Sequence, residues 1–163
     1  MARGGYRRVV ARDWALFLHL VGVLAFVGGS IAVAALRLLA IGKERPAESA
    51  ALLRAVRPLV PLVGLGLVLT LGTGVWLADE LAVPYDSGWL LWTYALVAWL
   101  VVVGAVAGRR DRRTRELAER VAREGDRPSA ELDRRLRDPV SLALNASMLV
   151  ATFAIVALMV WKP

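Results

Sequence analysis

His19 is the residue with the greatest chemical potential, because it is the only histidine in the chain and lies within an apolar stretch. Imidazole binds metals through a ring nitrogen, and ionisable groups at membrane depth usually face a bundle interior or a cavity. At helical spacing Gly22, Phe26 and Gly29 share its face. Two glycines beside a histidine indicate either close helix packing or a slot for a flat ligand. The simpler alternative is a neutral histidine that only bonds to a neighbouring helix.

Further candidates lie in two later apolar stretches, where Gly72, Thr73 and Gly74 follow one another and Tyr94 lies further along. Counted from the same end of the apolar segments, His19, Thr73, Tyr94 and Ile155 fall in one layer of the membrane. We therefore predict a cofactor pocket in the outer third of the bilayer. Its predicted residues are His19, Gly22, Phe26, Gly29, Gly72, Thr73, Gly74 and Tyr94. Small residues also let helices pack closely, which is the alternative role for the glycines.

The residue types that are missing from the chain or from its apolar segments exclude or disfavour several kinds of chemical site. The chain has no cysteine, which excludes disulfides and thiolate metal sites, and its single histidine excludes a two-histidine metal or haem site within one chain. No Asp, Glu, Lys or Arg lies well inside an apolar segment, so proton relays and ion-coupled transport lack their usual carboxylates. Asn145, paired with Ser141 or Ser147, is expected to join helices through hydrogen bonds.

The elements that position these residues are four apolar segments. The 163-residue chain is 58% hydrophobic, against about 45–50% in soluble domains. Crossing the hydrocarbon core takes about 20 apolar residues, and four segments qualify: 14–36, 58–78, 89–108 and 140–161. The sequence predicts an all-α integral membrane four-helix bundle, with residues 1–163 as a single domain. A cleaved signal at Ala32–Ala34 is the competing interpretation of the first segment, whose apolar run is long for a signal peptide.

The basic residues predict the orientation. Sixteen of the 21 Lys and Arg lie in loops 37–57 and 109–138, so we expect both loops to be cytoplasmic, with both termini outside a bacterial inner membrane. The arginines of the N-terminal tail argue the other way. Tryptophans gather near the opposite face, as interfacial anchors or as the rim of an opening. They are Trp14, Trp76, Trp89, Trp92 and Trp161.

Loop 109–138 is predicted to be helical and to lie at anionic lipid headgroups, with a break at Gly125–Pro128 and a helix cap at Ser129. Helical pairs at i,i+4 spacing are expected to stabilise it. They are Glu116/Arg120, Glu119/Arg123, Glu131/Arg135 and Asp133/Arg137. Asp138 before Pro139 is expected to cap the fourth span. Nucleic-acid binding is excluded, because eight acids balance the eleven arginines of this loop and it has no aromatic residue.

The motifs also resemble known families. His19 followed by Phe26–Gly29 is similar to the opening helix of the copper-resistance D family, and Leu69–Trp76 with a terminal Val160–Pro163 is similar to the HemJ-type protoporphyrinogen oxidases. The nearest resemblance is to small bacterial predicted integral membrane proteins of uncharacterised role. In the oxidases a first-span histidine is a haem ligand and a third-span lysine is functional. The resemblance implies His19 as an axial ligand, whereas the third span here, beginning Trp89–Tyr94, contains no lysine.

Three functions remain open from the sequence. The first is a membrane protein that binds haem b through His19, with electron transfer or porphyrin handling as its role. The second is a non-catalytic accessory or structural subunit, homo-oligomeric or bound to another membrane protein, in which His19 and the glycines only pack helices. The third is a small oligomeric channel or transporter. Whether the protein is an enzyme stays open.

Overall fold

The computed structural model describes residues 2–161, and the side chains from Val10 onward. The N-terminal Arg3, Arg7 and Arg8, and the terminal Lys162–Pro163, lie outside the side chains described. Within the described range the chain forms six helices and no strand. They are α1 (Ala2–Ile41), α2 (Pro46–Ala55), α3 (Leu59–Glu80), α4 (Gly88–Arg123), α5 (Ala130–Leu136) and α6 (Pro139–Trp161).

Four helical stretches are long and apolar enough to cross a membrane, which confirms the all-α, four-span prediction. The helices continue well beyond the apolar segments, most clearly in α4. After Gly108 no proline or glycine occurs before Gly125, so the helix runs on to Arg123 through a highly charged sequence. We keep the term membrane-spanning segment for the apolar residues 14–36, 58–78, 89–108 and 140–161, and count the polar extensions as outside them.

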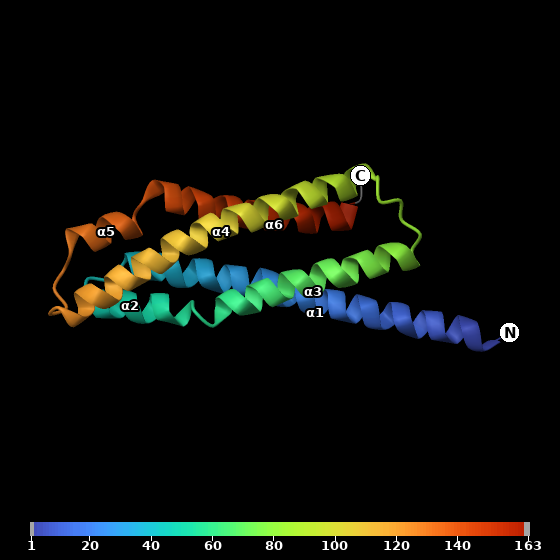
Figure 1. Ribbon diagram of the computed structural model, residues 1–163, viewed down its shortest axis with the longest axis horizontal. Coiled ribbons are helices and arrows are strands. Elements are labelled where there is room, and N and C mark those ends of the chain that lie inside the picture. The colour runs from blue at the N-terminus through green and yellow to red at the C-terminus, as the bar shows by residue number, and fades with distance from the viewer. Residues whose placement is uncertain (1, 162–163) are drawn as a thin grey trace.

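The spans pack as two pairs, α1 with α3 and α4 with α6, and α1 and α6 make few contacts across the pairs (Figure 1). Glycines bring α1 and α3 together. A Cβ added at Gly66 would lie 2.6 Å from the backbone nitrogen of Phe26, and one added at Gly22 would lie 2.7 Å from Thr70 Oγ1. No side chain fits at such a distance, so the two backbones are in direct contact.

At one end of the molecule the two pairs are joined by a small helical core outside the membrane-spanning segments, where α2 and α5 lie (Figure 1). Its buried residues come from α1, α2, α4 and α5: Ala40, Ala50, Leu53, Leu117, Ala118, Leu132 and Leu136. Residues 37–57 were predicted to form a loop, so α2 is an addition to the predicted elements. Pro46 at the first position, Glu48 in the first turn and Arg54 in the last turn are signals typical of a helix.

The polar helices carry the predicted cap and half of the predicted ion pairs. Ser129 accepts a hydrogen bond from the Leu132 amide at 3.4 Å, which confirms the cap. The pairs Glu131/Arg135 and Asp133/Arg137 form at 3.5 and 2.7 Å. The other two predicted pairs are wrong, because both carboxylates have nearer arginines. Glu116 pairs with Arg112 at 2.8 Å, and Glu119 faces α2 and pairs with Arg54 at 3.5 Å.

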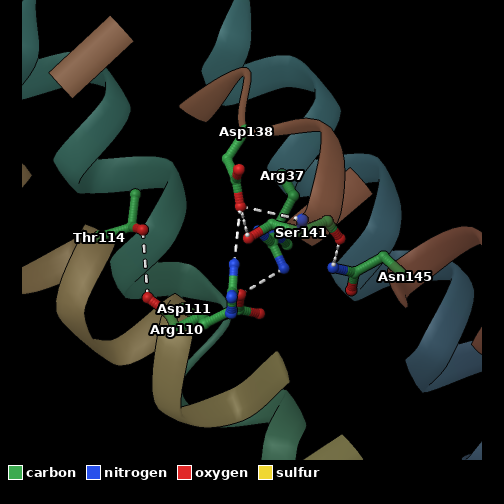
Figure 2. A network of polar contacts seen from close by, with 7 residues as sticks. All are labelled: Arg37, Arg110, Asp111, Thr114, Asp138, Ser141 and Asn145. Carbon is green, nitrogen blue, oxygen red and sulfur yellow. Dashed lines mark hydrogen bonds and ion pairs between the residues drawn. The ribbon is translucent and has the colours of Figure 1, made fainter. Parts of the chain in front are cut away.

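Asp138 connects the start of α6 to α4 (Figure 2). Its Oδ2 accepts hydrogen bonds from the Ser141 amide at 3.0 Å and hydroxyl at 2.7 Å, and pairs with Arg110 at 2.9 Å. These Ser141 bonds hold the pKa of Asp138 below its usual value and confirm the predicted cap. Asn145 donates to the Ser141 carbonyl of its own helix at 2.7 Å. The expected pairing of Asn145 with Ser141 is confirmed, but the bond lies within one helix and does not join two, because the carbonyl one turn back is already within reach.

A second ion pair, between Arg37 of α1 and Asp111 of α4, joins the two helix pairs directly (Figure 2). Only 12% of the Arg37 side chain and 22% of the Asp111 side chain are exposed. Burial raises the pKa of Asp111, and the Arg37 charge opposes that rise only in part. The pair thus ties α1 to α4 just outside the membrane-spanning segments, at the end of the molecule opposite His19.

Candidate cofactor site between the helix pairs

A cavity of about 410 Å³ lies between the two helix pairs, within the volume range of small-molecule sites. All four spans and the α3–α4 connection contribute to its wall, which is mostly apolar. Its main residues include His19 and Phe26 from α1, Thr70 and Gly74 from α3, Thr93 and Tyr94 from α4, and Thr152, Ile155 and Met159 from α6. Among the residues whose side chains are described, no Asp, Glu, Lys or Arg lines it. An occupant would therefore be a largely apolar molecule held by few polar contacts.

His19 reaches across the α1–α3 contact. Its Nδ1 lies 3.0 Å from the Thr70 carbonyl oxygen and 3.3 Å from Thr73 Oγ1. A carbonyl oxygen only accepts, so Nδ1 carries a hydrogen and donates it to Thr70. In the neutral imidazole the other ring nitrogen, Nε2, keeps its lone pair. Among the residues described, nothing forms a hydrogen bond with Nε2.

Glycine makes the Thr70 carbonyl accessible. Gly74 lies one turn after Thr70, where a larger side chain would crowd the approach of the imidazole. A Cβ at Gly74 would lie 3.3 Å from His19 Cε1 and 3.6 Å from Nδ1. That is tight enough to displace the ring by a few tenths of an ångström. The lack of a side chain at Gly74 therefore leaves the space that the His19 ring occupies.

The threonine hydroxyls at and behind the cavity wall are satisfied by their own helices. Each donates to the carbonyl four residues earlier, at 2.6 to 2.9 Å, as Thr70, Thr73, Thr93 and Thr152 all do. Such back-bonding removes these hydroxyl hydrogens from the cavity. Two polar groups of the wall remain without an internal hydrogen-bond partner in the described chain, His19 Nε2 on α1 and the Tyr94 hydroxyl on α4. One offers a lone pair and the other a donor.

The structure brings together most of the residues predicted for the pocket. His19, Phe26, Gly74 and Tyr94 line the cavity, and Thr73 is buried against the imidazole. The remaining three predicted residues lie elsewhere. Gly22 and Gly29 face α3, where an added Cβ would meet Thr70 and Val63 respectively. Gly72 is exposed on α3, with nothing within 4 Å of an added Cβ, and it does not line the cavity.

Two features of the site were missed by sequence reasoning. The partner of the imidazole is a backbone carbonyl, which no residue type marks, although the Thr70–Gly74 spacing is a usable hint. Met159 lines the cavity from α6, but a lone methionine in a span carries no distinguishing signal. No cluster of three or more His, Cys, Asp or Glu that could hold a metal ion occurs among the described residues.

Comparison with known families matches residues 13–163 to the family described as "Predicted integral membrane protein (DUF2269)". This match covers all four spans. Neither the curated proteins nor the solved structures contain a significant match.

Proposed function

The chain belongs to this family of predicted integral membrane proteins, and we propose that it binds haem b in the cavity, where His19 would hold the iron. The role we propose is electron transfer or porphyrin handling in a bacterial inner membrane. When bound, haem would supply one-electron chemistry. The contribution of this chain is to bind the macrocycle, orient its ligand and exclude water. The likeness to the copper-resistance D and HemJ-type families stays a resemblance.

The arrangement of the imidazole carries this proposal. Histidines that bind metals almost always donate their second ring N–H to a carboxylate or backbone carbonyl, which fixes both the tautomer and the ring orientation. His19 has such a bond to the Thr70 carbonyl, at 3.0 Å. Its Nε2 is therefore ready to act as a ligand at the wall of an apolar cavity.

The other residues of the cavity fit a porphyrin in chemical character. Phe26, Val27 and Leu67 offer an apolar wall, and Gly74 leaves room at the imidazole. The Tyr94 hydroxyl can donate a hydrogen bond to an oxygen of the ligand. Because no cation of the described part of the chain lines the cavity, charged propionates would have to lie at its outer opening, toward the headgroups. Leu81 and Val83 of the α3–α4 connection border the cavity on that side.

An absorption spectrum of detergent-purified protein from haem-replete cells tests the proposal. We expect a Soret band in the wild type and its loss in His19→Ala, because no other described residue of the cavity offers an imidazole. Gly72→Ala is the matched control, since Gly72 is exposed and away from the cavity, and it should keep the band. Helical content by circular dichroism checks that each variant folds. A colourless wild-type preparation would overturn haem binding, and a band unchanged in a folded His19→Ala would overturn His19 as the ligand.

An accessory or structural role is the second candidate, and a specific observation favours it. The bond from His19 to Thr70 and the contact between Gly22 and Gly66 hold α1 against α3 without any ligand. The protein would then be a homo-oligomer or a subunit of a larger membrane assembly. In that case His19→Ala should lower thermal stability to the same extent in haem-replete and haem-depleted preparations. A channel or transporter has less support, because none of the described residues of the cavity wall is charged.

We further propose that the end containing α2 and α5 is cytoplasmic and that both termini lie outside. The uneven distribution of arginine supports this orientation. The chain has no cysteine, so Ser87→Cys and Ser129→Cys each introduce a single thiol. In intact cells a membrane-impermeant maleimide should label the position 87 variant and not the position 129 variant. The reverse pattern would invert the topology.

A further inference from the structure

A second hollow lies outside the membrane-spanning segments, between the α2–α3 junction and the polar extension of α4. It measures about 570 Å³ and lies at the opposite end of the molecule from the His19 cavity. We refer to it as the arginine groove. Its lining is mostly charged: Arg54, Arg57, Arg112, Arg115, Glu116 and Glu119. Four guanidinium groups thus surround one hollow with only two carboxylates.

The ion pairs leave an excess of positive charge in the arginine groove. Glu116 pairs with Arg112 at 2.8 Å, and Glu119 pairs with Arg54 at 3.5 Å. Arg57 and Arg115 form no ion pair within 4 Å among the described residues. Arg115 lies within electrostatic range of Glu116 and of Asp111, but those carboxylates are bound to Arg112 and Arg37. Two guanidinium groups in the groove are therefore available to an anion.

The position of the arginine groove along the helices fits the lipid headgroup layer. Headgroups add about 5–7 Å on each side of the hydrocarbon core. At about 1.5 Å per helical residue, Arg57 lies within that layer immediately before the second span, and Arg112 lies about 6 Å beyond the end of the third span. Arg115 is about 10 Å beyond that end along a straight helix, and less when the helix is tilted. Arg57 and Arg112 therefore lie at the depth of the lipid phosphates, and Arg115 lies a few ångströms beyond it, within reach of an arginine side chain.

We propose that the arginine groove binds the phosphate of an anionic phospholipid headgroup, with Arg57 and Arg115 as its principal ligands. Guanidinium groups bind phosphate oxygens through charge-assisted, often bidentate hydrogen bonds. The adjoining spans expose Val60 and Val106, so the acyl chains of the same lipid would meet an apolar surface. A lipid is favoured over a soluble phosphate compound because the groove borders the hydrocarbon region. This inference is independent of haem binding.

Thermal unfolding of the detergent-solubilised full chain tests the site, with added phosphatidylglycerol, phosphatidylcholine or inorganic phosphate. We expect phosphatidylglycerol alone to raise the melting temperature. The double variant Arg57→Gln/Arg115→Gln should require about tenfold more phosphatidylglycerol for half of the effect. The matched control is Arg123→Gln/Arg127→Gln, which removes two exposed arginines from the same end of the molecule but outside the groove, and should respond as the wild type does.

Three results would contradict the proposed site or its ligand. An equal loss of response in the two double variants would show non-specific surface charge and overturn the site. An equal shift with inorganic phosphate, lost in the groove variant, would overturn the lipid as the ligand. Arg57→Gln alone guards against misfolding of the double variant. Arg57 is exposed, so its substitution leaves the core intact and should raise the required lipid concentration by a smaller factor. An unchanged requirement in Arg57→Gln would contradict its assigned role.

Discussion

Replacing Asp111 by alanine should lower the free energy of unfolding by about 3 kcal/mol, at the lower end of the range for breaking a buried ion pair. The Arg37 side chain is only 12% exposed, so its guanidinium would stay out of water with no carboxylate beside it. Asp111 is also the direct ionic link between α1 and α4. The measurement is SDS-induced unfolding in mixed micelles, followed by tryptophan fluorescence.

Two further variants distinguish the effect of burying an unpaired charge from the effect of losing an ion pair. Glu116→Ala removes a carboxylate from the same helix, but its pair with Arg112 is exposed, and the loss should stay within about 0.5 kcal/mol. Arg37→Met/Asp111→Leu removes both charges and should recover most of the loss of Asp111→Ala, because neither charge is left buried alone. If Asp111→Ala destabilised the protein no more than Glu116→Ala, the pair would not connect the helix pairs energetically.

Much of the fold follows from the sequence, because membrane-spanning helices have a strong and simple signal. A run of about 20 uncharged residues can cross the bilayer only as a helix or in a closed barrel, so the four segments were predictable. The sequence signals that mark the polar helices are weaker. Ser129 and Asp138 were identified as caps, since a cap depends only on neighbouring residues. The Glu119–Arg54 pair depends on where α2 docks, which local sequence does not specify.

For the candidate site, the depth of each residue in the membrane could be predicted from the sequence, but the side of each helix that faces the cavity could not. Residues at equal depth in antiparallel spans share a layer, which brought His19, Thr73 and Tyr94 together correctly. Which side of a helix faces the cavity depends on the packing partner. Gly72 and Gly74 are almost adjacent in sequence, yet they point to different sides of α3, and only Gly74 meets the imidazole. An apolar helix in lipid has little amphipathic pattern, so its sequence does not mark the buried face.

The packing of α1 against α3 is a condition for the site, because Thr70 reaches His19 only while the two backbones touch. Gly66 and Gly22 are the points of closest approach. Arg37 and the small helical core hold the other end of the molecule independently of this contact. Disturbing the α1–α3 contact should therefore affect the imidazole more than it affects the polar end.

Gly66→Ala should lower the free energy of unfolding by about 2–3 kcal/mol, toward the upper end of the range for overpacking. The added Cβ would lie 2.6 Å from the Phe26 backbone nitrogen and 3.0 Å from the Gly22 carbonyl oxygen, and backbone atoms cannot rotate away. α1 and α3 must separate, which lengthens the bond from His19 to Thr70. Gly66→Leu should be more severe, because its side chain needs a larger separation.

Gly64→Ala is the matched control for this prediction. Gly64 lies on the same helix, but nothing is within 4 Å of an added Cβ. That variant should be neutral or more stable by up to about 1 kcal/mol, because alanine removes the conformational cost of glycine in a helix. The same SDS titration measures both variants. Equal effects would mean that helix propensity governs both positions, and that close approach of α1 and α3 does not hold His19 in place.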